Sequence, residues 1–221
     1  MAISVQTIIE NARILLQDTD EGGIRWVDTE LIAWLNEGAT EIVRIHPESH
    51  AKNVDFPLVQ GTKQQIPSEG MQLLNIYRNT NGSGVPGRAI RLINMDIMNN
   101  ERPSWHIDSP NPIVTRYMFD SKDPRTFYVY PPNTGAGHVS LVYSAAPTPV
   151  TQLSDTIPVM DVYAAPLTNY VCYRAWFKQV GDATAMQRAS SFLELFNGAM
   201  GVKKEVEAVS DPNARGMNGA I

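Results

Sequence analysis

The sequence predicts an α+β protein in which a four-helix bundle, built from both chain ends, carries an inserted antiparallel β-sandwich or barrel-like domain. Two segments with apolar residues at helical spacing open the chain, and two more close it. Each helix pair alone would expose an apolar stripe, and packing the pairs together covers both. The predicted organisation is the first half of the bundle in residues 1–50, the β-rich insertion in 51–150, the second half of the bundle in 151–209 and a flexible tail in 210–221.

Apolar periodicity predicts the first two helices. The first begins at about Ser4, and the second begins at the N-cap residue Asp28 and ends before Pro47. Val27 and Ile32 are placed to form a hydrophobic staple around the start of the second helix. The inner faces are predicted to be Val5, Ile8, Ile9, Ala12 and Leu16 in the first helix, and Leu31, Trp34, Leu35, Ala39, Ile42 and Ile45 in the second.

The insertion is predicted to be mostly antiparallel because short apolar runs are separated by turn residues. Hairpin turns are predicted at 81–84 and 133–135, and a longer turn at 120–124. Asn94 is predicted to cap one short helical segment. The predicted strands are 53–56, 63–66, 73–79, 88–93, 113–119, 126–130 and 139–144.

The second half of the bundle begins with a segment, 161–180, that is apolar nearly all round and therefore needs partners on more than one side. Gly181 suits a left-handed C-terminal cap and Asp182 an N-cap, so the last helix is predicted to turn back at once. The residues after Gly201 are predicted to extend it. Its inner stripe is predicted to be Met186, Ala189, Leu193, Phe196 and Met200.

Composition restricts the class of protein. The chain is 43% hydrophobic and 19% charged, with no apolar run of membrane-spanning length and no signal-peptide layout, which predicts synthesis in a cytoplasm and no membrane partner. A net charge of −5 has the wrong sign for gripping nucleic acid by its phosphates. The lone cysteine, Cys172, lies in an apolar helix and is interpreted as a buried, inert thiol.

No catalytic, cofactor-binding or metal-binding residues are predicted. The histidines lie in different segments without zinc-site spacing. The glycines Gly82, Gly84 and Gly87 are interpreted as part of a hairpin turn, because Pro86 removes an N–H donor and a strand follows. Asp120 and Asp123 are interpreted as carboxylates that each close a turn onto nearby backbone N–H groups, since Pro124 follows directly and the spacing lacks the alternating ligands of a calcium loop.

An aromatic cluster leaves two interpretations open. Its members alternate along a half-buried strand, which favours a packing role, but stacking on sugars or bases is the alternative. The cluster consists of Trp105, Tyr117, Phe127, Tyr128 and Tyr130.

Five motifs, taken together in order and spacing, carry a resemblance to a known family. They are RW-x3-EL-x2-WLNEG-x2-EIV-x3-P (25–47), QIP-x2-G-x2-LL-x3-RN (65–79), Y-x-FDSKDP-x2-FYVYPP (117–132), VYSAAP (142–147) and YRA-x2-K (173–178). With these motifs the chain resembles the head-to-tail adaptor proteins of tailed bacteriophages over most of its length. Pro166 departs from the family pattern, because it falls early in the third helix, where it is expected to kink the helix or delay its start.

The resemblance implies a structural virion protein that forms a ring, commonly dodecameric, beneath the portal. The ring would connect capsid and tail and extend the channel through which genomic DNA passes without sequence-specific binding. The implied partners are the portal protein, tail or nozzle proteins and further copies of the chain. The implied location is the neck of the virion, after assembly in the host cytoplasm. The resemblance carries no catalytic residues.

The resemblance also implies that the C-terminal segment contacts the portal. Independently, residues 213–221 are too small and polar to pack alone, and ordering them without contacts would cost on the order of 10–20 kcal/mol. The portal-contact candidates are Val202, Lys203, Lys204, Val206, Val209, Asn213, Arg215, Met217 and Ile221.

Two alternatives belong to other classes of protein. One is a tail component whose β-rich domain binds a ligand or glycan, and the other is a virion-associated hydrolase. Exposed apolar stripes on the helices would favour assembly over both alternatives, whereas a concave polar pocket would favour them.

Overall fold

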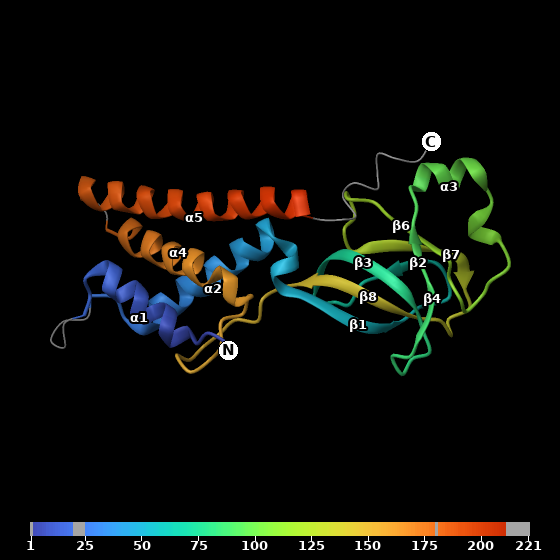
Figure 1. The fold of residues 1–221 in the computed structure, drawn as a ribbon, viewed down its shortest axis with the longest axis horizontal. Coiled ribbons are helices and arrows are strands. Elements are labelled where there is room, and N and C mark those ends of the chain that lie inside the picture. The colour runs from blue at the N-terminus through green and yellow to red at the C-terminus, as the bar shows by residue number, and fades with distance from the viewer. Residues whose placement is uncertain (1, 20–24, 180, 211–221) are drawn as a thin grey trace. The chain divides into compact units, whose positions relative to one another are not determined.

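The structure is a computed structural model that describes residues 2–19, 25–179 and 181–210, with the backbone alone described in 202–210. Over these residues the protein is a mixed α+β protein with five α-helices and two four-stranded sheets. The chain divides into two compact units, one formed by residues 1–49 with 147–221 and the other by residues 50–146 (Figure 1). We call them the helical unit and the β unit.

The helical unit contains α1 (Val5–Leu16), α2 (Asp28–Ile45), α4 (Ala164–Phe177) and α5 (Ala183–Ser210). All four contribute to one hydrophobic core. Helix α4 contacts α1, α2 and α5, and its buried residues are distributed around its circumference. The apolar character of this segment is therefore explained by neighbours on several sides.

The start of α2 differs from the prediction. Val27, not Asp28, occupies the N-cap position and makes no side-chain capping hydrogen bond, while Asp28 is the first helical residue. The Asp28 carboxylate instead accepts a hydrogen bond from Arg13 Nη2 at 2.6 Å. Val27 is 53% exposed while Ile32 is buried, so the predicted hydrophobic staple is wrong.

Pro166 delays α4 without interrupting it. A short 3₁₀ turn, Asp161–Tyr163, precedes the helix, and Pro166 is the third helical residue. The N–H groups of the first turn have no acceptor within the helix, so a proline there removes no helical hydrogen bond.

The turn into α5 follows the prediction, but part of the inner stripe does not. Gly181 has φ +90°, and Asp182 Oδ1 accepts a hydrogen bond from Thr184 N at 2.9 Å. Met186 is 43% exposed, and Ala185 is buried in its place. The remaining buried residues of the described stripe are Ala189, Phe196 and Met200, with Leu193 half-buried. The helix continues to Ser210.

Two sheets make up the β unit. The first has the order β1-β8-β3-β4 and the second β2-β7-β6-β5. Antiparallel pairing joins neighbouring strands except β5 and β6, which are parallel and so depart from the predicted pattern. The strands are β1 (Ala51–Pro57), β2 (Gly61–Gln65), β3 (Gly70–Thr80), β4 (Pro86–Ala89), β5 (Arg91–Leu92), β6 (Arg116–Phe119), β7 (Thr126–Asn133) and β8 (His138–Ala145).

The predicted strand 88–93 is two strands because the chain changes sheets at Ile90. Ile90 is buried and donates its N–H to Tyr77 O in the first sheet at 3.0 Å. The next residue, Arg91, donates its N–H to Thr115 O, beside the second sheet, at 3.1 Å. β4 and β5 are consequently edge strands of different sheets.

The sheets share one hydrophobic core, as in a sandwich. Leu73, Leu141 and Tyr143 from the first sheet cluster with Phe127 and Val129 from the second. Among the described residues both sheets are open, so the predicted barrel-like closure is wrong. Helix α3 (Met95–Glu101) supplies a second, smaller core in which Met98, Trp105 and Met118 are fully buried.

Candidate assembly surfaces

The predicted portal-contact residues fall in the least described part of the chain. Val202, Lys203, Lys204, Val206 and Val209 lie on the last turns of α5, where only the backbone is described. Asn213, Arg215, Met217 and Ile221 lie outside the described residues. The contact assignment therefore stays a prediction from the sequence.

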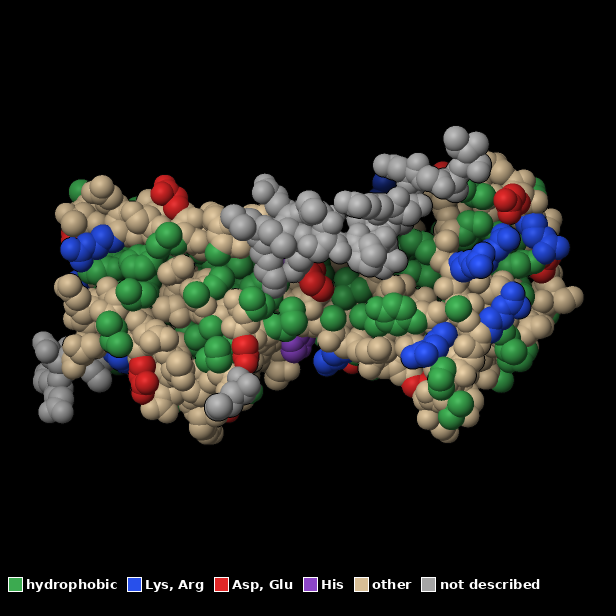
Figure 2. Space-filling model, viewed as in Figure 1, with side chains coloured by type: hydrophobic (Ala, Val, Ile, Leu, Met, Phe, Trp, Pro, Cys, Tyr) green, Lys and Arg blue, Asp and Glu red, His purple; other side chains and the backbone are tan. Residues whose placement is uncertain are grey.

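Large apolar side chains are exposed on several parts of the helical unit. Ile14 on α1 is 65% exposed, Val162 before α4 is 62% exposed and Leu195 on α5 is 57% exposed. Figure 2 shows hydrophobic side chains spread over one face of this unit. Contiguous apolar patches are typical of surfaces that assemble with other proteins, whereas single exposed apolar side chains also occur on monomers.

An open groove of about 320 Å³ lies between α2 and α4. Its charged lining residues pair with each other or with their neighbours: Lys178 Nζ lies 2.5 Å from Glu30 Oε1, and Arg174 Nε lies 3.2 Å from Glu37 Oε2. These partly exposed ion pairs add little stability, and because the charges are already paired they leave little electrostatic attraction for a charged ligand. Ala33, Trp34 and Phe177 complete the lining.

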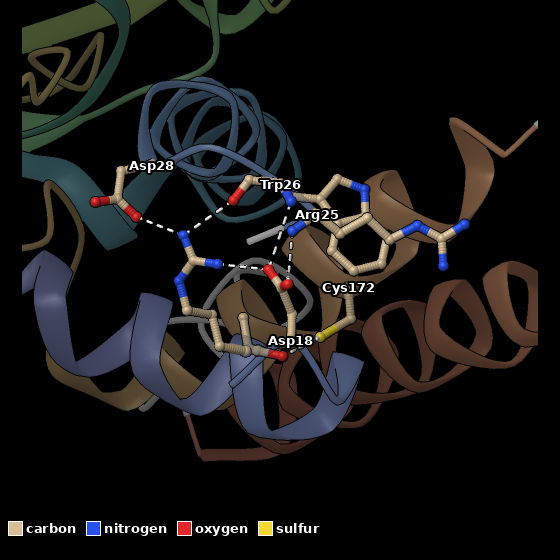
Figure 3. A network of polar contacts seen from close by, with 7 residues as sticks. Asp18, Arg25, Trp26, Asp28 and Cys172 are labelled. Atoms are coloured by element: carbon tan, nitrogen blue, oxygen red, sulfur yellow. Dashed lines mark hydrogen bonds and ion pairs between the residues drawn. The ribbon is translucent and has the colours of Figure 1, made fainter. Parts of the chain in front are cut away.

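A buried ionic network fixes the connection between α1 and α2 (Figure 3). Asp18 is 5% exposed, and its carboxylate receives Arg13 Nη1 at 2.5 Å and the backbone N–H of Arg25 at 2.8 Å. The second arm of Arg13 donates to Trp26 O at 2.9 Å and to Asp28. Arg13 and Asp18 each make several hydrogen bonds, as a largely buried ion pair requires. We call this network of Arg13, Asp18, Trp26 and Asp28 the clamp.

Next to this clamp, two tryptophan rings lie between two arginine side chains. The rings of Trp26 and Trp176 meet edge to face at 5.9 Å, with Arg25 5.0 Å from the first ring and Arg188 4.6 Å from the second. Cation–π contacts of this type orient the rings and cover their faces. The cluster links the start of α2 with α4 and α5.

Cys172 lies beside the clamp and is chemically quiet. Its Sγ is 3.9 Å from Ala12 O, and the residue is fully buried. Burial raises the pKa of the thiol to about 12, because a thiolate would be desolvated in this core. The interpretation as a buried, inert thiol is therefore supported at the level of burial and ionisation.

The aromatic cluster of the β unit is part of its packing. Trp105 and Phe127 are fully buried and Tyr117 is 3% exposed. The Trp105 indole donates to Asn99 Oδ1 at 2.9 Å, and its ring stacks on His106 at 3.7 Å between centroids. The three most buried rings of the cluster cannot present a face to a sugar or base, which favours the packing interpretation.

The predicted turns are closed by their own polar side chains. Asp120 Oδ1 accepts a hydrogen bond from Lys122 N at 2.9 Å, which confirms Asp120 as a turn-closing carboxylate. Among the described residues the Asp123 carboxylate accepts no hydrogen bond, so the same interpretation is wrong for Asp123. Gly82 and Gly84 have φ of +80° and +77°, and the Asn81 side chain accepts from Ser83 N at 3.0 Å. These are turn conformations in which glycine is favoured.

Metal-binding clusters and membrane-spanning helices are both absent from the part of the chain that the structure describes. That part contains no group of three or more His, Cys, Asp or Glu side chains that could hold a metal ion. Across the same residues, no helix is both long enough and apolar enough to cross a membrane.

Two arrangements could not be seen in the sequence. One is the network in which Arg13 joins Asp18, at the end of α1, to Trp26 and Asp28 at the start of α2. The other is a pair of arginines, Arg91 on β5 and Arg116 on β6, which are register partners at the edge of the second sheet. No short motif marks either arrangement, because both depend on tertiary pairing.

The described residues thus form a helical unit with exposed apolar side chains and a β unit whose aromatic cluster is largely buried. The chain matches the SU10 adaptor protein family over residues 3–216 and belongs to that family, a group of tailed-bacteriophage head-to-tail adaptors. It is accordingly a structural virion protein of the head–tail connection, and this membership is consistent with a non-enzyme. Association with portal and tail proteins follows from the same membership. No curated protein matches the chain.

Proposed function

We propose that this adaptor forms a dodecameric ring that binds beneath the portal in the neck of the virion. The ring would extend the DNA channel toward the tail. The family match over residues 3–216 carries the proposal, because it spans both units and not one module alone. Genomic DNA would pass through the ring without sequence-specific binding, and assembly would take place in the host cytoplasm.

In this proposal the four helices from both chain ends act as one bundle that forms the body of the ring. The shared core of the helical unit supports it, because α1, α2, α4 and α5 all bury residues there. The exposed Ile14, Val162 and Leu195 support it as well, since a ring subunit needs apolar surface for its neighbours. Each subunit in a ring contacts two neighbours as well as the portal, so modest contacts add up.

We propose that residues 202–221 contact the portal. The support comes from the sequence: residues 213–221 are small and polar and have little capacity to pack alone, which favours a partner that supplies their contacts.

The test is the mass of the complex formed when the purified protein is mixed with the portal ring from the same genome, measured by analytical ultracentrifugation. The expected result is saturation at one adaptor per portal subunit. If the two proteins sediment separately at several salt concentrations, direct binding to the portal is wrong. The glycan-binding alternative would then be tested next, although burial of Trp105 and Phe127 weakens it.

A further inference from the structure

The edge of the second sheet carries two arginines side by side. Arg91 on β5 and Arg116 on β6 are register partners in a parallel pair, so their side chains leave the same face of the sheet. Neighbouring strands are about 4.8 Å apart, and like charges at that spacing destabilise a sheet. Folding of the isolated chain therefore gives no reason for this pair.

Acidic residues of the β unit pair with only one of the two arginines at this edge. Arg116 Nη1 lies 3.3 Å from Glu101 Oε2, but among the described residues Arg91 has no ion pair and is exposed. Arg78 and Arg88, on the neighbouring β3 and β4, are also exposed. Figure 2 shows Lys and Arg side chains gathered on the β unit. The arrangement is suited to binding an anion from outside the unit.

The chemistry of the edge favours a carboxylate on a protein. The cations are arginines, whose planar guanidinium groups bind carboxylates with two parallel hydrogen bonds. Leu92, the next residue of β5, pairs with the buried Tyr117, so its side chain leaves the opposite face of the sheet from the two arginines. Arginine is enriched at protein interfaces, where it pairs with carboxylates of the partner.

The chain itself carries a complementary surface. The β unit has nine Lys and Arg against seven Asp and Glu, while the helical unit has nine against sixteen. Among the described acidic side chains of the helical unit, Glu194 on α5 is the one with no hydrogen bond or ion pair, and it is exposed. The next residue, Leu195, is 57% exposed. At Gly198, one turn further, an added Cβ would meet no atom within 4 Å, so a partner can approach closely.

We propose that Arg91 and Arg116 of one copy bind the Glu194 carboxylate on α5 of a second copy. The proposal rests on the ring of the proposed function and names the contact between neighbours. Because the two halves of the contact are different surfaces, every copy offers both, and the contact repeats from copy to copy as a ring requires.

The first experiment is a charge exchange in the full chain, followed by sedimentation velocity over a wide concentration series. Arg91→Glu alone and Glu194→Arg alone are each expected to weaken self-association about tenfold or more, because each places like charges together. An equimolar mixture of the two variants again places opposite charges at positions 91 and 194 of every contact. Because Arg116 is unchanged, the mixture is expected to recover association measurably above either variant alone, but not to the full wild-type level. A mixture that stays dissociated overturns the proposal, as does a wild-type chain that is monomeric throughout.

The second experiment separates this role from protection of a sheet edge against aggregation, which charged residues also provide. Arg91→Gln is expected to raise Tm by about 1–3 °C, since it relieves the like-charge pair, and to weaken self-association. The matched control is Lys63→Gln, which removes a charge from β2, the opposite edge of the same sheet, and is expected to leave association unchanged. Stronger association of Arg91→Gln would identify edge protection and overturn the proposal.

A third measurement covers the remaining class of partner. If Arg91→Gln reduces binding to a duplex DNA oligonucleotide and leaves self-association unchanged, the edge binds phosphate and the proposal is wrong. Portal binding by the wild type is measured in parallel. If the wild type binds the portal but the mixture of variants does not regain association, only this contact is wrong. If the mixture regains association but the wild type does not bind the portal, only the proposed function is wrong.

Discussion

Asp18 shows how much one buried carboxylate can contribute to this fold. Asp18→Asn replaces a charge that faces Arg13 and is expected to lower the free energy of unfolding by about 3 kcal/mol, because Arg13 keeps its charge in a largely buried site. Urea denaturation measures the change. The control is Glu41→Gln in the exposed Arg44–Glu41 pair of α2, expected to cost less than about 0.5 kcal/mol. Equal losses in the two variants would show that Asp18 is not a clamp.

Asp55 on β1 gives the β unit a defined response to acid. The pKa of its carboxyl is lowered, chiefly because the Thr80 hydroxyl donates to Oδ1 at 2.6 Å, with further contributions from Gly84 N–H at 2.8 Å and from His138. A lowered folded-state pKa means that the stabilisation is present above the unfolded pKa of about 3.9 and is lost as pH falls through the folded value.

Asp55→Asn is therefore expected to destabilise the protein at neutral pH and to approach the wild type in stability below about pH 4. Thermal unfolding of both chains across a pH series measures the difference. A difference that stays constant down to the lowest pH at which the wild type is folded would show that the Asp55 charge does not contribute.

Residues that act on their own neighbourhood could be predicted from the sequence. Ser4 and Asn94 cap helices, and Asp120 closes a turn, because each bonds to backbone only a few residues away. Asp28 could not be predicted in the same way. Its side chain is taken by Arg13, fifteen residues earlier and on another helix, so the local capping rule is overridden by a tertiary contact.

Among the elements, two helices carry glycines with opposite consequences. Gly198→Ala in α5 is expected to stabilise the free chain by about 1 kcal/mol, since alanine favours helix and nothing lies within 4 Å of the added Cβ. Gly38→Ala in α2 is expected to destabilise it by about 1–3 kcal/mol, because the new methyl group would lie 2.9 Å from Leu167 and Tyr170 on α4. Chemical denaturation of both variants tests the pair. Changes of the same sign would contradict the assigned packing.

Periodicity predicted the existence of the elements better than their phase. The stripe expected on α5 began at Met186, but Ala185 is the buried residue, about 100° away around the helix. Both phases share Ala189, Phe196 and Met200, so periodicity alone does not choose between them. The prediction favoured Met186 because it is the larger apolar residue, but the smaller Ala185 is the one that is buried. In the same way, an apolar run at 88–93 cannot reveal that the chain changes sheets at Ile90.

For the chain in its entirety, the pairing of both ends in the helical unit was within reach of the sequence, because two helix pairs flank a block with a different period. The strand order was not. Strand β8 lies between β1 and β3, and β5 runs parallel to β6, and neither pairing is encoded in local turn chemistry. The portal contact was inferred from resemblance and from a tail poor in packing residues.

Removal of residues 211–221 tests that contact in the full assembly. The truncated chain is expected to keep a Tm nearly equal to that of the wild type, because the deleted segment is small and polar, and to bind the portal ring more weakly. Calorimetry and sedimentation with the portal measure the two quantities. Unaltered affinity for the portal would remove the segment from the contact, and a large fall in Tm would assign it to the fold.

The pairing of Ala51 with Ser144 at the start of β1 and the end of β8 has an evolutionary consequence. The chain enters and leaves the β unit through antiparallel partners whose Cα atoms are about 5 Å apart, a gap that a two-residue turn can bridge. Recombination at these two joints would exchange the entire insertion as a cassette, while the helices kept their own core. Such an exchange would replace the β unit and leave the helical unit as it is.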